Sequence, residues 1–210
     1  MNVLIFGASG ATGRELVTQG LGRGHAILAF VRNPAKIEIR HPNLRLHQGN
    51  VADRAAVERA VQGQDEALCA LGGSSLFKRE PSIVIGVHNI LMAMEKFGVR
   101  RFIYLSNDAV HDVRPQLSFF QRNFIAPVLL RSVAADHELN EGMIKQSSLD
   151  WIIVRPALLT KGEATGAYRS GERINATSII PRISRADLAQ FMLNQLTEDR
   201  FIHEAPVVMY

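Results

Sequence analysis

The sequence predicts a doubly wound α/β fold, with a parallel sheet covered by helices on both faces, in a single domain that spans residues 1–210. Short, nearly continuous apolar runs alternate with amphipathic stretches, a pattern typical of strands buried on both faces. A glycine-rich turn follows the first apolar run directly. A chain of 210 residues is long for one ordinary domain and short for two, which favours one domain.

Six strands are expected where the apolar runs are rich in β-branched or aromatic residues. They are Asn2–Phe6, Ala26–Val31, Leu44–His47, Glu66–Leu71, Arg101–Leu105 and Trp151–Val154. Most of these runs are followed by a segment with apolar spacings of three and four, so the strands are expected to be joined by helices and to run parallel.

Five helices are expected from those spacings. They are Thr12–Leu21, Arg54–Val61, Ile83–Phe97, Val133–Gln146 and Arg185–Leu196. Asp53 is placed to cap the helix that begins at Arg54. Ser184 is placed to cap the last helix, and Asp187 lies three residues later in an approximate capping box.

Two segments break this alternation. Residues Asn107–Arg131 contain Phe119, Phe120 and Phe124, and residues Ala157–Ile174 are rich in Gly and Thr. Both follow carboxyl ends of strands, where open α/β sheets bind ligands, so we expect them to form pocket walls or lids. The second segment is expected to build a small C-terminal extension on the substrate side. The Phe-rich segment is equally compatible with a helix that only packs on the body.

The glycine motif reads Gly7-Ala8-Ser9-Gly10-Ala11-Thr12-Gly13 and joins the first strand to the first helix. In this context the first glycine permits a tight turn, the second lets the backbone approach a pyrophosphate, and the third lets helix pack on strand. The helix N-terminus offers unpaired N–H groups to phosphate. We therefore expect a Rossmann-type dinucleotide site formed by Gly7, Ser9, Gly10, Ala11, Thr12 and Gly13.

The end of the second strand predicts which dinucleotide binds. Sites that prefer NAD place Asp or Glu there, whereas this chain has Arg32. A guanidinium at that point pairs with a 2′-phosphate, and Arg14 adds a second positive charge. The sequence therefore favours NADP (NADPH), with NAD less favoured. The alternative is that Arg32 only stacks on adenine, as it would with either nucleotide.

Two further strand ends are assigned to the same pocket. Asn50, followed by Val51, closes the third strand and is placed to hydrogen-bond the adenine amine. Leu71 and Gly72 close the fourth, where small residues let the backbone approach the ribose and phosphate. Asn and Gly are also common in turns, so each assignment has a purely structural alternative.

These strand ends, together with the run from Ser147 to Pro156 (SSLDWIIVRP), resemble the atypical short-chain dehydrogenase/reductases. Within that group the chain is most similar to the NmrA-like proteins and to the flavin reductase/biliverdin-β-reductase type. The second likeness is carried by Gly63-Gln64-Asp65, Thr165-Gly166-Ala167-Tyr168 and the run Ile183–Leu188 (ISRADL). The resemblance implies that Gly7, Gly10, Thr12 and Gly13 hold the pyrophosphate, that Arg32 meets the 2′-phosphate, and that Ser106, Asn107 and Pro156 flank the nicotinamide.

The sequence departs from this family at its catalytic pair, Tyr-x-x-x-Lys. Aligned by position, Val133 and His137 stand in those two places, and valine cannot exchange a proton. His137 is still expected to hydrogen-bond the ribose. Ser106 and Asn107 are the candidate polar groups nearest the reacting carbon, with an alternative role in fixing the loop. The stretch Ala157-Leu158-Leu159 lacks the histidine that biliverdin reductases often carry there, which argues against biliverdin.

Three functions fit these residues. The first is an NADPH-dependent reductase of a flat aromatic small molecule such as a flavin or quinone, because such acceptors delocalise charge and take their proton from water. The second is an NADP-binding sensor of NmrA-like type without turnover. The third, a nucleotide-sugar epimerase-like enzyme, is disfavoured because that chemistry also relies on Tyr-x-x-x-Lys.

Composition excludes several other classes. The net charge is +4 and the arginines are scattered, which does not predict a nucleic-acid interface. No apolar stretch reaches the length of a membrane span, and the N-terminus does not read as a secretion signal. Cys69 is the single cysteine, which suits a reducing compartment. We therefore expect a cytoplasmic protein, as a monomer or homodimer. His137 and Glu141 lie one helical turn apart, but no second pair completes a metal site.

Overall fold

The computed structural model describes residues 1–72, 81–106, 131–172, 174, 178 and 181–210, with residues 131–135 described only as helical backbone. The strands are β1 (Asn2–Phe6), β2 (Ala26–Val31), β3 (Leu44–Gln48), β4 (Glu66–Cys69), β5 (Arg101–Leu105), β6 (Asp150–Pro156), β7 (Leu158–Thr160), β8 (Arg169–Gly171), β9 (Arg182–Ser184) and β10 (Val207–Met209). The helices are α1 (Ala11–Gly22), the 3₁₀ turn η1 (Pro34–Lys36), α2 (Arg54–Val61), α3 (Pro81–Phe97), α6 (Arg131–Gln146) and α7 (Arg185–Asn194).

One eight-stranded sheet runs through the molecule in the order β3-β2-β1-β4-β5-β6-β10-β8. All pairs from β3 to β10 are parallel, and only β8 is antiparallel, against β10. The strand order reverses between β1 and β4, because the chain builds outward from β1 to β3 and then crosses back. Ligands of doubly wound sheets bind at this reversal, outside the carboxyl ends of the strands.

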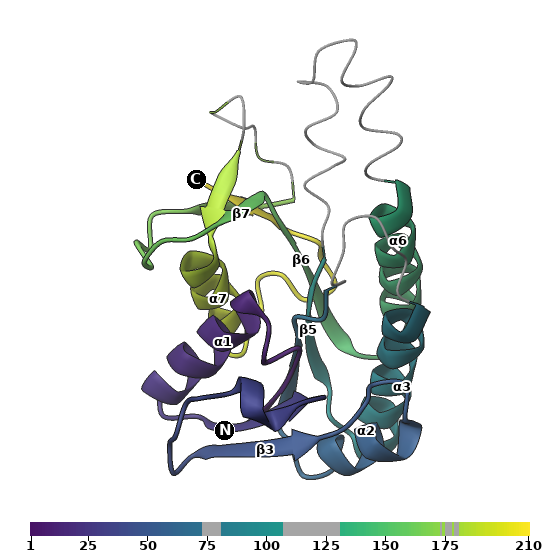
Figure 1. Ribbon diagram of the computed structural model, residues 1–210. Helices are drawn as coiled ribbons and strands as arrows, with labels where there is room; N and C mark the ends of the chain where they lie inside the picture. The colour runs from purple at the N-terminus through teal and green to yellow at the C-terminus, as the bar shows by residue number, and fades with distance from the viewer. Residues whose placement is uncertain (73–80, 107–130, 173, 175–177, 179–180) are drawn as a thin grey trace.

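Helices cover both faces of the sheet, with α1 and α7 on one face and α2, α3 and α6 on the other (Figure 1). The central strands explain why two layers are needed: Val3, Leu4, Ile5 and Phe6 of β1 are all completely buried, and their side chains alternate between the two cores. A strand that is apolar on both sides is stable only when both sides are covered. The predicted doubly wound α/β fold is confirmed.

The six strands and five helices predicted from the sequence are confirmed, with ends within two residues of those expected. Asp53 caps α2 by accepting hydrogen bonds from the backbone N–H groups of Ala55 and Ala56. Ser184 caps α7 by accepting from the N–H of Asp187. The capping box at α7 is half formed, because the N–H of Ser184 donates instead to the hydroxyl of Tyr210 at 3.1 Å.

The small strands near the end of the chain were missed by the sequence analysis, which expected one irregular connection over 157–174. β10 extends the sheet beside β6, β8 pairs with β10, and β7 and β9 form a separate two-stranded sheet. Each of these strands is three residues long, too short for an alternating pattern to be read.

Asp187, at the start of α7, holds this extension together. It is fully buried. Its carboxylate accepts hydrogen bonds from the N–H and hydroxyl of Thr165 at 2.8 and 2.9 Å, from the N–H of Gly166 at 2.7 Å and from the hydroxyl of Tyr210 at 2.7 Å. Burial alone would raise the pKa of Asp187, but these hydrogen bonds lower it below its ordinary value.

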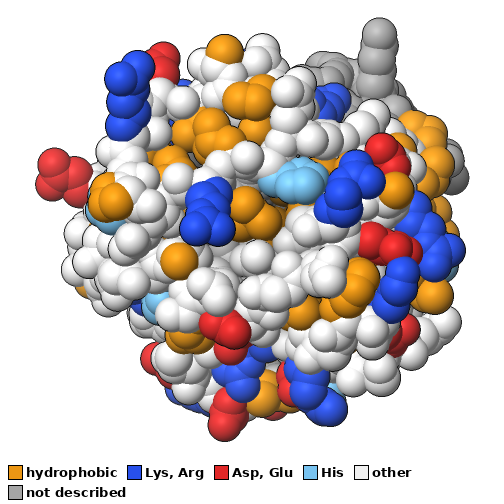
Figure 2. Space-filling model, turned by 90° about the horizontal axis from the view of Figure 1, so that it is seen from below, with side chains coloured by type: hydrophobic (Ala, Val, Ile, Leu, Met, Phe, Trp, Pro, Cys, Tyr) orange, Lys and Arg blue, Asp and Glu red, His pale blue; other side chains and the backbone are white. Residues whose placement is uncertain are grey.

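Charges of both signs are interspersed on the face that carries the edge strand β3, as Figure 2 shows. Exposed Arg45 and Leu46 lie on that strand. Among the described residues, no helix combines the length and the apolar character that crossing a membrane requires.

The buried carboxylate of Asp187 makes the free energy of unfolding depend on pH in the acid range. The folded-state pKa is depressed, so the stabilisation is present above the unfolded pKa of about 3.9 and is lost as pH falls through the lower folded-state pKa. We expect Asp187→Asn to lower the free energy of unfolding by about 3 kcal/mol at neutral pH and to remove this acid-dependent component.

Urea denaturation of both proteins at pH 7 and in acid measures this effect. Tyr210→Phe is the comparison variant: it leaves the carboxylate but removes one of its donors and the acceptor of the Ser184 N–H, and it should cost about 2 kcal/mol. Equal stability of Asp187→Asn and the wild type at pH 7 would contradict the role of the carboxylate.

Candidate functional site

The turn between β1 and α1 depends on two close backbone approaches. Gly7 adopts φ +77°, and a Cβ there would lie 2.4 Å from the carbonyl oxygen of Ala70, which directly follows β4. A Cβ on Gly13 would lie 2.1 Å from the carbonyl oxygen of Gly7. Both distances are far shorter than any real contact, so only glycine fits at either position. The turn therefore draws β1, α1 and the end of β4 together.

The first turn of α1 presents backbone N–H groups that have no hydrogen-bond partner within the helix. Gly10 is the N-cap and has no side chain to accept from the amides of Ala11, Thr12 or Gly13. The first N–H groups of any helix lack partners within the helix, and the helix dipole makes this end positive. Glycine at the N-cap therefore leaves an anion-binding terminus, which fits the diphosphate of a dinucleotide.

A cavity of about 150 Å³ opens beside this turn at the carboxyl ends of β1, β2 and β4. The residues that line it are Gly7, Ser9, Gly10, Phe30, Val31, Arg32, Asn50, Val51, Ala70, Leu71, Gly72, Ser82 and Ile83. Eight of the residues proposed from the sequence for cofactor binding are among them: Gly7, Ser9, Gly10, Arg32, Asn50, Val51, Leu71 and Gly72. The residues proposed from the sequence thus overlap with the lining of this cavity, and their role in cofactor binding stays a prediction.

The other proposed residues lie elsewhere. Ala11, Thr12, Gly13 and Arg14 form the first turn of α1 and do not line the cavity. Ser106, His137 and Pro156 lie at β5, α6 and β6, away from the cavity lining. Asn107 and the Phe-rich residues Phe119, Phe120 and Phe124 lie outside the described residues.

The two arginines proposed from the sequence are placed differently: Arg14 lies on the first turn of α1, and Arg32 lines the cavity. The Nε of Arg14 donates to the carbonyl oxygen of Ser9 at 3.1 Å and so ties the helix start to the glycine turn. Arg32 is exposed and lines the cavity, and no carboxylate in the described part of the chain pairs with it. Its guanidinium is thus available to an anion on the ligand.

The loop after β3 is fixed by contacts that the sequence analysis did not identify. The Nδ2 of buried Asn89 on α3 donates to the carbonyl oxygen of Val51 at 3.0 Å. Gly86 lets α3 approach, because a Cβ there would lie 2.5 Å from a methyl carbon of Val51. The Oδ1 of Asn50 accepts from the N–H of Ala52 at 3.1 Å, and its Nδ2 has no hydrogen-bond partner in the described part of the chain. A polar residue on the apolar face of α3 was the available signal for Asn89.

A second cluster lies where β5 and β6 meet α6. The buried carboxylate of Glu141 accepts from the hydroxyl of Ser106 at 2.8 Å and from Nη2 and Nε of Arg155 at 2.6 and 3.2 Å, and Lys145 lies 3.2 Å away. Burial would raise the pKa of Glu141, but the hydrogen bonds from Arg155 and Ser106 lower it below its ordinary value. The hydrogen of the Ser106 hydroxyl is therefore committed to Glu141, and its lone pairs remain as acceptors.

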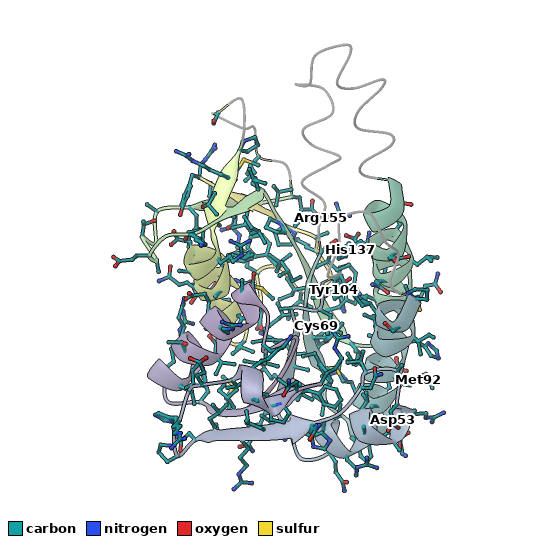
Figure 3. All side chains as sticks on the ribbon, in the orientation of Figure 1. Asp53, Cys69, Met92, Tyr104, His137 and Arg155 are labelled. Carbon is teal, nitrogen blue, oxygen red and sulfur yellow. The ribbon has the colours of Figure 1, made fainter. Side chains whose placement is uncertain are left out.

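His137 sits beside this cluster and contacts Tyr104 of β5. Its Nδ1 lies 2.9 Å from the hydroxyl oxygen of Tyr104, which also receives a hydrogen bond from Nδ2 of Asn140 at 2.9 Å. Figure 3 shows Tyr104, His137 and Arg155 in turn along the side of the sheet that faces α6. Burial raises the pKa of Tyr104 above its ordinary value and lowers that of His137. Tyr104 was not expected at the site, because its place in an apolar strand gave no signal.

Other chemistry has little support among the described residues. No three His, Cys, Asp or Glu side chains gather there as metal ligands. Cys69 is completely buried in β4, and burial raises the pKa of its thiol to about 12, so it is not a nucleophile at neutral pH.

Comparison with known proteins adds to this geometry. The model of the NAD(P)H-binding family matches residues 7–199. A 3β-hydroxysteroid dehydrogenase/Δ5→4-isomerase from Mycobacterium tuberculosis is 34% identical over 119 residues, which cover 51% of this chain and 32% of that protein. A (4-alkanoyl-5-oxo-2,5-dihydrofuran-3-yl)methyl phosphate reductase from Streptomyces griseus is 27% identical over 154 residues, 73% of this chain and 46% of that protein. The matches thus span less than half of either relative.

Among solved structures, an anaerobillin reductase from Escherichia coli O157:H7 superposes with a TM-score of 0.80 at 20% identity, covering 99% of this chain and 96% of that one. This likeness shows that the whole fold is shared. With its glycine turn, its strand order and a family match over most of its length, the chain belongs to the NAD(P)H-binding family.

Proposed function

We propose that the protein is an NADPH-dependent reductase that transfers a hydride to a flat aromatic acceptor of the flavin or quinone type. The observation that carries the proposal is the cavity at the strand reversal, where a glycine turn, an uncapped helix start and an arginine with no carboxylate partner among the described residues converge. When bound, the reduced nicotinamide supplies the hydride. The protein supplies binding, orientation and exclusion of water.

Different residues of the described site bind different parts of the dinucleotide. The amides of the first turn of α1 take the diphosphate. Phe30 and Val31 give the cavity an apolar wall for the adenine, and the free Nδ2 of Asn50 donates to a ring nitrogen. The Ser106 hydroxyl donates its hydrogen to Glu141, so the lone pairs of the Ser106 oxygen are left to accept a hydrogen bond from the nicotinamide carboxamide.

The preference for NADPH rests on charge. Arg32 is exposed at the cavity and pairs with no carboxylate in the described part of the chain, so a 2′-phosphate would be its natural partner. A guanidinium grips phosphate with two parallel hydrogen bonds. An NAD site would need an acceptor for the ribose hydroxyls at this position, and Arg32 is only a donor.

The acceptor class rests on the absence of a proton-donating tyrosine or serine among the described residues of the site. The family's tyrosine position is occupied by Val133. Tyr104 is fully buried with a raised pKa, and the Ser106 hydroxyl is committed to Glu141, so neither offers a proton. Flavins and quinones delocalise the incoming charge and take their proton from water, so they require none from the protein. The Streptomyces griseus relative, named a reductase, supports this direction of hydride transfer.

A kinetic panel tests the proposal. Purified protein is mixed with NADPH and with FMN, FAD or a soluble quinone, and the oxidation of NADPH is followed by its absorbance against a protein-free control. We expect turnover with at least one acceptor. Tight binding of NADPH, measured by calorimetry, without turnover on any acceptor would replace the reductase with a nucleotide sensor.

Substitution of Arg32 tests the assignment of the 2′-phosphate. We expect Arg32→Ala to weaken NADPH binding about 10- to 100-fold, because a charge-assisted hydrogen-bond pair is lost, and to change NADH binding by less than about threefold. Calorimetric titration with both nucleotides measures the difference. Arg45→Ala, which removes an exposed arginine from β3 outside this cavity, is the matched control and should alter neither affinity. Equal losses for both nucleotides would remove Arg32 from the phosphate.

A further inference from the structure

Three polar side chains form a hydrogen-bonded row between β5 and α6. They are Tyr104, which is fully buried, Asn140, which is 1% exposed, and His137, which is half-buried near the upper end of α6 (Figure 3). The two hydrogen bonds of the row meet at the hydroxyl oxygen of Tyr104, and each is 2.9 Å long. The row leads from the interior to the carboxyl end of β5.

The direction of each hydrogen bond in the row can be worked out. The Nδ2 of Asn140 can only donate, so the oxygen of Tyr104 accepts from it. A phenol carries one hydrogen, and among the described residues the remaining hydrogen-bonding neighbour of this hydroxyl is Nδ1 of His137. The hydroxyl of Tyr104 therefore donates to Nδ1, and Nδ1 is an acceptor. A neutral imidazole that accepts at Nδ1 carries its proton on Nε2.

The opposite orientation of the Asn140 amide is less favourable. In the observed orientation one atom, Oδ1 of Asn140, has no hydrogen-bond partner. Turning the amide over would pair Oδ1 with the Tyr104 hydroxyl but leave the buried NH₂ group with no partner among the described residues, whereas the observed orientation keeps one of its hydrogens bonded and leaves a carbonyl oxygen unpaired, which proteins tolerate better. Buried donors without partners are strongly disfavoured, so the observed orientation is the better one.

The surroundings keep His137 neutral. Burial lowers its pKa, and the opposing effect of the carboxylates of Glu141 and Asp136 is smaller. Glu141 is already engaged by Ser106, Arg155 and Lys145. At neutral pH the ring thus has one N–H group, on Nε2.

We propose that Asn140 and Tyr104 are positioning residues that fix His137 in its Nε2–H tautomer, so that the ring offers a hydrogen-bond donor to a hydroxyl or carbonyl oxygen of the ligand. The proposal rests on the proposed function for the identity of that ligand, a nicotinamide dinucleotide. A ribose hydroxyl is the oxygen of the right chemistry. The hydrogen-bonded row makes His137 an uncharged hydrogen-bond donor, whereas a lysine at position 137 would donate from a positively charged group.

Nitrogen-15 NMR of the histidine rings tests the tautomer without cofactor or turnover. His137 is assigned by its absence from the spectrum of His137→Gln. In the wild type at neutral pH we expect Nε2 to carry the proton and Nδ1 to be a hydrogen-bonded acceptor. Tyr104→Phe removes the donor to Nδ1, and Asn140→Leu frees the oxygen of Tyr104 to accept from Nδ1. In both variants we therefore expect the Nδ1–H tautomer to become populated.

Tyr168→Phe is the control, since Tyr168 packs against Phe191 on the opposite face of the sheet and should leave the tautomer unchanged. A wild-type ring protonated on Nδ1, or on both nitrogens, would overturn the proposal even if one variant fails to fold. The donor role toward the ligand has its own readout, an expected loss of about five- to tenfold in NADPH affinity in both variants. Unchanged affinity would overturn that role. If no acceptor is reduced, the reductase fails, while the NMR result still decides the tautomer.

Discussion

The contact between the backbones of Gly7, Gly13 and Ala70 is the constraint on which the rest of the site depends. No side chain fits at Gly7 or Gly13, because β1, α1 and the end of β4 approach one another more closely there than a Cβ atom allows. This closeness aims the start of α1 at the strand reversal and leaves its amides open, since Gly10 cannot cap them. A side chain at Gly7 would collide with the backbone of Ala70 after β4, and one at Gly13 would collide with the carbonyl of Gly7, so either would disturb the turn that positions the start of α1.

Charged side chains are arranged differently on the two sides of the glycine turn. At the adenosine side Arg32 is left without a carboxylate in the described chain, whereas at the β5–α6 side Arg155 and Lys145 are paired with one buried acid, Glu141. The first arrangement keeps a cation for a ligand. The second uses cations to stabilise a carboxylate that in turn holds Ser106. In the described part of the chain, the end of β5 thus carries a fixed acceptor and the end of β2 carries a cation with no carboxylate partner.

The fold and eight of the residues that line the cavity could be picked out from the sequence because their signals are local. Buried parallel strands such as β1 show as apolar runs, and the glycine turn and Arg32 lie at fixed distances from them. Tyr104, Asn89 and Asn140 could not be predicted, because their partners are 33 or more residues away and nothing near them in sequence marks the pairing. The same holds for Asp187, read as half of a local capping box, whose main partners come from Thr165, Gly166 and Tyr210. β10 joins the sheet as a three-residue strand, too short for any periodic pattern.

The burial of Cys69 in the middle of the sheet has a practical consequence. It is the single thiol of the chain, and it lies in β4 between β1 and β5, with none of its surface exposed. A thiol reagent can therefore reach it only when the strands separate, so its alkylation rate reports how often the centre of the protein opens. Because β4 ends at the glycine turn, a bound nucleotide should slow that opening, and the molecule carries its own reporter of ligand occupancy.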